Sequence, residues 1–263
     1  LYGASLLSVA AEPVLGLQQN AIGIILFVAI GVILSLGKVL YKTVEQLQKY
    51  LIGISVPIIV GLTYYLATNF DLLTLLKGLS GQGIINGEPY LFLPPGIALG
   101  TFLGAMAYAG AGGNLNLTQS CYVRDKGYGM GKYAQRITSL ITAGGSSDTF
   151  KISGNTFPTT PENMIRFRQW CKLINWEHFL IFWALGLFTM LTLSLLAYIT
   201  TFRKGDNAVG VSFIFYEAIA IDQATLPILG TVFLVITGVM LCATQLTVLD
   251  STTRIITENI LLL

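Results

Sequence analysis

Charge is scarce in this sequence. Charged residues make up 11% of the 263 residues, and the formal net charge is only +2. Soluble domains carry about 25% charged residues, so this chain is too apolar for an ordinary soluble domain. A net charge this small also excludes the broad basic surface that nucleic-acid binding needs. We therefore expect a membrane protein whose surroundings are the lipid bilayer, with no nucleic-acid partner.

The residues that enzymes and metal proteins need are also few. The only histidine is His178, and none of the three cysteines forms a CxxC pair. The sequence contains no zinc-site spacing, no HExxH and no GxSxG. The glycine-rich run 126–133 fails as a P-loop, because Lys126 replaces a glycine and Tyr133 replaces the required Ser or Thr. We expect no enzyme and no cofactor, and we interpret His178 as an interfacial anchor.

Long apolar runs are what the sequence does contain. A helix needs about 20 apolar residues to cross about 30 Å of hydrocarbon. No run alternates with period two, so strands are not expected and the predicted fold is an all-α integral membrane bundle in a single domain. The chain begins with leucine and ends in three leucines, which suggests an internal piece of a longer protein. The predicted spans are residues 1–11 (partial), 18–37, 50–70, 95–123, 178–202 and 225–250.

Lysine and arginine gather in alternate loops, which predicts the orientation. Segments 38–49 and 124–177 hold most of the basic residues, whereas 71–88 and 203–222 hold few. Basic loops face the cytoplasm. The first two segments should therefore be cytoplasmic and the other two external.

The cytoplasmic segment should contain a helix that starts at Thr160-Pro161-Glu162, which combines a capping hydroxyl, a first-position proline and an acid. One helix over 161–202 would be about 63 Å long, which exceeds the membrane thickness. We therefore expect a break near Asn175–His178.

Residues 95–123 contain the most informative pattern. Gly96, Gly100 and Gly104 recur every four residues, a spacing that lets a second helix approach closely. The run Gly110-Ala111-Gly112-Gly113 then disfavours helix, and it is followed at once by Asn114, Asn116, Thr118 and Gln119. A glycine-interrupted apolar segment is a pointer to a transporter binding site. The alternative is a flexible kink at 110–113 that only aids packing.

The end of the fifth apolar run carries ionisable side chains. Asp250 and Arg254 are four residues apart and can pair on one helix face. One interpretation is a structural ion pair where the helix leaves the membrane. Alternatively, Gln245, Asp250 and Arg254 belong to an ion or proton path, because ionisable groups at membrane depth are costly.

Two segments resemble one family. The run AGAGGNLNLTQSCYVRDKGYGMGKY (109–133) resembles the sixth helix and following loop of distant Nramp-family divalent-metal transporters. The segment TQLTVLDSTTRIITE (244–258) resembles the end of their eighth helix. The resemblance implies a partial LeuT-like inverted-repeat symporter fold, in which this chain runs from the end of helix 3 to helix 8. It also implies that the carbonyls of Ala109 and Gly110 and the side chain of Asn114 contact a metal ion.

The sequence departs from the family at its metal-binding motif. Nramp proteins carry Met-Pro-His-Asn at the helix break, where this chain has Ala111, Gly112, Gly113 and Asn114. Only the asparagine remains, so selection for soft transition metals loses its thioether ligand.

We interpret the chain as a secondary transporter of a divalent cation in a prokaryotic inner membrane. The substrate should contact residues between 109 and 119: Ala109, Gly110, Ala111, Gly112, Gly113, Asn114, Asn116 and Gln119. A symporter for a small organic solute on the same fold and a non-transporting membrane scaffold are the alternatives.

Overall fold

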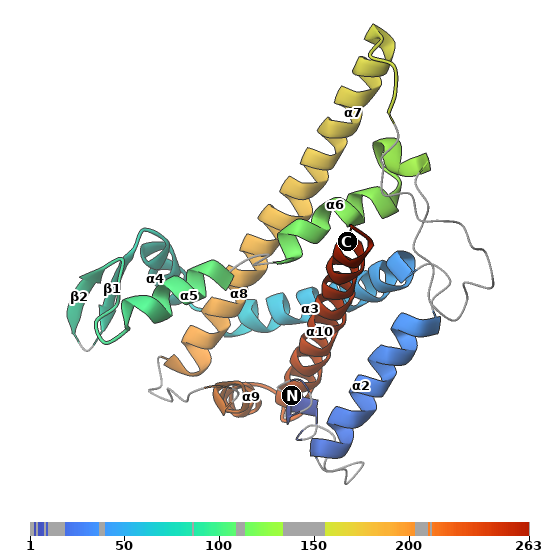
Figure 1. The fold of residues 1–263 in the computed structure, drawn as a ribbon. Coiled ribbons are helices and arrows are strands. Elements are labelled where there is room, and N and C mark those ends of the chain that lie inside the picture. Colours follow the sequence, from blue (N-terminus) through green and yellow to red (C-terminus); the bar gives the residue numbers. More distant parts are fainter. Residues whose placement is uncertain are drawn as a thin grey trace.

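Helices make up most of the structure. The computed structural model describes residues 3, 5–7, 9, 19–36, 40–85, 87–108, 114–133, 156–202, 210 and 212–262 (Figure 1). Its α-helices are α2 (Gln19–Leu36), α3 (Leu40–Leu66), α4 (Asn69–Leu79), α5 (Leu99–Tyr108), α6 (Asn114–Lys126), α7 (Pro161–Glu177), α8 (Leu185–Thr200), α9 (Ser212–Ala224) and α10 (Leu229–Leu262). Short 3₁₀ and π-helical segments, η1 (Gly129–Tyr133) and η2 (His178–Ala184), complete the helical elements.

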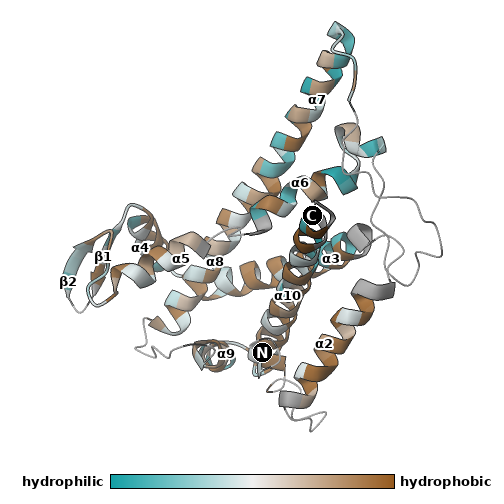
Figure 2. Cartoon of the chain, in the orientation of Figure 1, coloured by the Kyte–Doolittle hydropathy of each residue, from teal (hydrophilic) through white to brown (hydrophobic). Residues whose placement is uncertain are grey.

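Within the described residues, three helices are long and apolar enough to cross a membrane: Val44–Leu66, Pro161–Thr200 and Leu229–Ile256. Helix α2 adds a shorter apolar stretch over Ala21–Ile33. Many large apolar residues of these helices are exposed. Figure 2 shows how much of their ribbons is coloured as hydrophobic. An exposed apolar surface of this extent suits a lipid surrounding rather than water. The chain is therefore an α-helical membrane protein.

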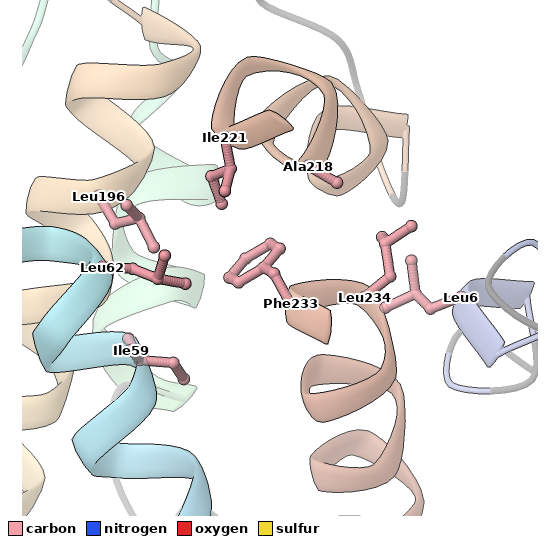
Figure 3. Packing of buried hydrophobic residues seen from close by; sticks show 8 residues of the cluster. All are labelled: Leu6, Ile59, Leu62, Leu196, Ala218, Ile221, Phe233 and Leu234. Carbon is pink, nitrogen blue, oxygen red and sulfur yellow. The ribbon is translucent and has the colours of Figure 1, made fainter. Parts of the chain in front are cut away.

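The spanning helices pack around one apolar core. Phe233 of α10 points toward Leu62 of α3, Leu196 of α8 and Ile221 of α9 (Figure 3). Helices α9 and α10 approach especially closely, because a Cβ on Gly230 would lie 2.3 Å from the carbonyl oxygen of Ala218. This core joins the last third of α3 and α8 to the beginning of α10.

The opposite ends of α3 and α10 also meet. Gln48, near the start of α3, donates a hydrogen bond to Thr247, near the end of α10. Since the end of α3 packs against the start of α10 in the core, these two helices are antiparallel. The start of α3 and the end of α10 therefore lie on one side of the bundle, in agreement with the alternation of basic loops. Which side faces the cytoplasm stays a prediction.

The expected break near Asn175–His178 is wrong. Helix α7 runs without interruption into η2 and α8, and His178 keeps helical backbone angles (φ −61°, ψ −45°). The chain has no proline or glycine between Glu162 and Leu185 that would stop the helix. Within this continuous helix, residues His178–Ala184 adopt the wider π-helical turns of η2. Helix α7 therefore extends well beyond the other helices, and its far end is polar (Figures 1 and 2).

Aromatic rings gather around η2. Phe179 packs edge-on against Trp176 with ring centroids 6.0 Å apart, and it stacks on Trp183 at 5.2 Å. Trp and Tyr are enriched where helices pass from hydrocarbon to headgroups. The aromatic cluster thus marks η2 as the membrane boundary of the long helix.

Strands were not expected, and this was also wrong. Strands β1 (Gln82–Ile85) and β2 (Glu88–Leu91) form an antiparallel hairpin in which Ile85 pairs with Glu88. The two-residue connection in the sequence is Asn86-Gly87, a strong hairpin signal, and Gly87 has φ +85°. The hairpin follows α4, which starts with a capping box between Thr68 and Asp71. Residues 69–91 thus form a small folded unit rather than a plain loop.

The glycine stripe does not form the expected packing surface. Gly96 lies before α5 with φ +87°, so it shares no helix face with Gly100 and Gly104. A Cβ at any of the three would meet no atom within 4 Å. Within the described residues, no second helix approaches this face.

Candidate functional site

The structure describes one short helix on each side of the predicted break. Helix α5 has 10 residues and α6 has 13, so each is shorter than the roughly 20 residues that cross a membrane. Residues 109–113, which include the predicted contacts Ala109, Gly110, Ala111, Gly112 and Gly113, lie outside the described part of the chain. Asn114 is the first residue of α6.

Helix α6 presents two different polar faces. Thr118, Cys121 and Asp125 are buried and recur at helical spacing on the side that packs against α10. Asn116 and Gln119 are exposed on another side. The predicted polar contacts of this helix are therefore divided between two environments.

A buried ionic cluster joins α6 to α10. The Arg254 guanidinium donates through Nε to both carboxylate oxygens of Asp250, at 3.0 and 3.1 Å, and through Nη1 to Asp125. Tyr122 donates its hydroxyl to Asp250 at 3.0 Å, and its ring lies 5.3 Å from the Arg254 guanidinium carbon. The ion pair between Asp250 and Arg254 was predicted, and it is confirmed. We refer to Tyr122, Asp125, Asp250 and Arg254 as the ionic cluster.

The charges of the ionic cluster nearly balance. Asp250 is 1% exposed and Arg254 is 3% exposed, so both are cut off from water. Arg124 adds a second cation at 3.3 Å from Asp125. Buried charges need such partners, since an unpaired ion pays several kcal/mol of desolvation. The cluster can therefore hold α6 and α10 in one fixed relation.

A pocket of about 190 Å³ lies on the other side of α6, against α7 and η2. Gln119 Nε2 lies 2.6 Å from His178 Nδ1 across this pocket. His178 also stacks on Phe182, with ring centroids 4.8 Å apart. The residue predicted as an interfacial anchor thus holds α6 to the long helix at the membrane boundary.

The end of α6 is fixed to the same helix by charge. Lys126 forms an ion pair with Glu177, and Tyr128 donates to the same carboxylate at 2.6 Å. Burial lowers the pKa of Lys126, but the hydrogen bonds to Glu177 and Tyr128 outweigh it and raise that pKa above its ordinary value. Lys126 is therefore charged at physiological pH, and the pair persists there.

The third residue of the predicted ion path lies apart from the other two. Gln245 is exposed on α10, whereas Asp250 and Arg254 are buried. Asp125, Lys126 and Glu177 were not singled out from the sequence. Their contacts join residues 51 and 129 positions apart, which no local spacing reveals.

No protein-family model, curated protein or solved structure matches this chain. Over the described residues, no three His, Cys, Asp or Glu side chains converge as a metal site would require.

Proposed function

We propose that this chain belongs to a secondary membrane transporter whose substrate binds where α5 gives way to α6. The observation that carries this proposal is that two short helices, 10 and 13 residues long, lie on either side of the glycine-rich residues 110–113. Transporters commonly bind substrate between such half-helices, where backbone groups are left free. The glycine-rich sequence 110–113 supplies the physical reason for the interruption.

The contacts of α6 support the same function. The ionic cluster holds one face of α6 to α10, and Gln119 and Lys126 hold another face to the long helix. These contacts place the last two turns of α6 firmly and leave its first residue, Asn114, beside the interruption. A substrate at Asn114 would therefore lie next to a helix whose position is fixed by charge.

We propose a hard divalent cation as the substrate. The carbonyls of Ala109 and Gly110 and the amide oxygen of Asn114 are oxygen ligands, which suit Mg²⁺. Position 111 is alanine, so no thioether is present there to favour Mn²⁺ or Fe²⁺. This substrate also accords with the resemblance to the Nramp family.

The first test measures cation uptake. The purified protein in liposomes should accumulate Mg²⁺, detected by a trapped magnesium-sensitive dye, and excess Mg²⁺ should compete with Mn²⁺. Micromolar Mn²⁺ binding that excess Mg²⁺ leaves unchanged would contradict the proposed selectivity. Flux of an anionic organic solute without any cation flux would favour organic-solute symport, and no flux at all would favour a scaffold.

A pair of double variants tests the site itself. Gly112→Ala with Gly113→Ala raises helix propensity by about 2 kcal/mol in sum, which should close the interruption and abolish uptake. The matched control is Gly100→Ala with Gly104→Ala, because added Cβ atoms there would meet nothing within 4 Å. The control should transport normally. Equal uptake by both variants would remove the interruption from the mechanism.

A further inference from the structure

Helix α9 carries an acidic side chain that neither the ionic cluster nor the α5–α6 junction uses. Glu217 is 3% exposed, and its neighbours Ala218 and Ile221 belong to the central apolar core. An acid within such a core is expensive to keep ionised, so buried acids normally have a partner or a function.

The carboxyl group of Glu217 has few polar contacts that would offset the free-energy cost of burying its charge. Its Oε1 atom has no hydrogen-bond partner in the described part of the structure. Helix α8 carries no charged residue, and the ionic residues of α10 begin at Asp250, about 25 Å along that helix from Phe233. On α9 itself, Asp222 is occupied in accepting a hydrogen bond from the Gly230 amide at 2.6 Å. Helix α3, which also packs on this core, carries no charged residue after Lys49. Among the described residues of α3, α8, α9 and α10, no cation therefore faces the carboxyl group.

The one polar partner of Glu217 is Thr200, at the end of α8. The Thr200 hydroxyl donates its proton to the Leu196 carbonyl oxygen at 2.7 Å. With that proton engaged, the hydroxyl oxygen can only accept, and a carboxyl group can donate to it only when protonated. Ionisation of Glu217 would require the hydroxyl to turn away from Leu196 and donate to the carboxylate. Thr200 can therefore stabilise ionised Glu217 only at the expense of its hydrogen bond to Leu196.

We propose that Glu217 is a proton-binding site that couples proton movement to transport. This inference rests on the proposed transport function. The Glu217 carboxylate takes one proton from water, its charge changes from −1 to 0, and the same proton later returns to water. Glu217 lies near the end of α8 that the basic-loop pattern places outside, which is where a proton entering with the substrate would bind.

The electrostatics of the site agree with this role. Burial raises the pKa of Glu217 to about 7, and the hydrogen bond with Thr200 opposes that shift by a smaller amount. A carboxyl group that titrates near neutral pH can both bind and release a proton under physiological conditions.

The test separates the proton site from transport. Infrared difference spectra of the protein in lipid, taken between pH 5 and pH 9, should show a protonated carboxyl band that disappears near pH 7. Glu217→Gln should remove this band, and Thr200→Val should move its midpoint upward, because the ionised carboxylate loses its donor. Glu88→Gln, an exposed acid on the hairpin, should leave the band unchanged. Persistence of the band in Glu217→Gln would overturn the proposal.

The second measurement is Mg²⁺ uptake into liposomes with and without an inward proton gradient. The wild type and Glu88→Gln should take up Mg²⁺ several-fold faster with the gradient, whereas for Glu217→Gln this ratio should fall to about 1. An unchanged ratio in Glu217→Gln would reject the coupling role while leaving transport intact. Absence of uptake by the wild type would instead reject the proposed function, and the infrared band would still decide whether Glu217 binds a proton.

Discussion

Arg254 pairs with carboxylates on two different helices. Its removal should therefore lower the stability of the fold more than removal of any single surface charge. Arg254→Met should leave Asp250 buried without its cation and lower the free energy of unfolding by about 3–5 kcal/mol. Thermal unfolding in detergent, followed by size-exclusion profiles, would measure the loss.

The matched control for Arg254 is Arg166→Met. Arg166 forms an i,i+4 pair with Glu162 at 2.6 Å, but both side chains are well exposed. Its removal should change stability by no more than about 0.5 kcal/mol. Similar losses from the two variants would show that the ionic cluster contributes no more than a solvated pair.

For single residues, the sequence predicts only those interaction partners that lie close together along the chain. The spacing of Asp250 and Arg254 predicts their ion pair, since four residues bring side chains together on any helix. Asp125 joins the pair only because α6 packs on α10, and that packing leaves no pattern in either segment. Glu217 could have been noticed as a lone acid within the apolar run 212–221, but its burial depends on α3, α8 and α10 together.

Among the elements, the long helix is the least expected. Spin labels at Ile165 and Met190, both exposed, should give one narrow distance distribution near 38 Å in electron-spin distance measurements, as a continuous helix of 25 residues requires. The labels need a background without the three native cysteines. A broad or much shorter distribution would indicate the break that the sequence suggested.

The errors at the level of elements have distinct causes. The break was expected from the thickness of a membrane, yet membrane thickness does not stop a helix that continues into water. The hairpin was missed because its strands are only four residues long, although Asn86-Gly87 signalled the turn. The interruption between α5 and α6 stays a prediction, since it rests on the local effect of glycine and asparagine on backbone conformation and residues 109–113 lie outside the described part of the chain.

For the whole molecule, the distribution of basic residues among the loops predicts which side of the membrane each end of the helix bundle faces. Single cysteines at Gln82 and Glu162 test it, because the first residue lies in the hairpin and the second at the polar end of α7. Both positions are exposed, so differences in reagent access should reflect the membrane alone. In intact cells, an impermeant thiol reagent should label position 82 and spare position 162. The reverse pattern would invert the orientation.

The 40-residue helix from Pro161 to Thr200 also has a mechanical consequence. At about 60 Å it is roughly twice as long as the hydrocarbon layer is thick, and the aromatic cluster at η2 marks where it leaves that layer. If this helix tilts as a rigid body, it should therefore pivot at the membrane boundary. A tilt of about 10° in α8 would swing the Pro161 tip through about 5 Å on the opposite side, given an outer arm of about 25–30 Å. Helix α6 is attached to the long helix close to this pivot. A small tilt of the long helix would therefore move α6 much less than it moves the Pro161 tip.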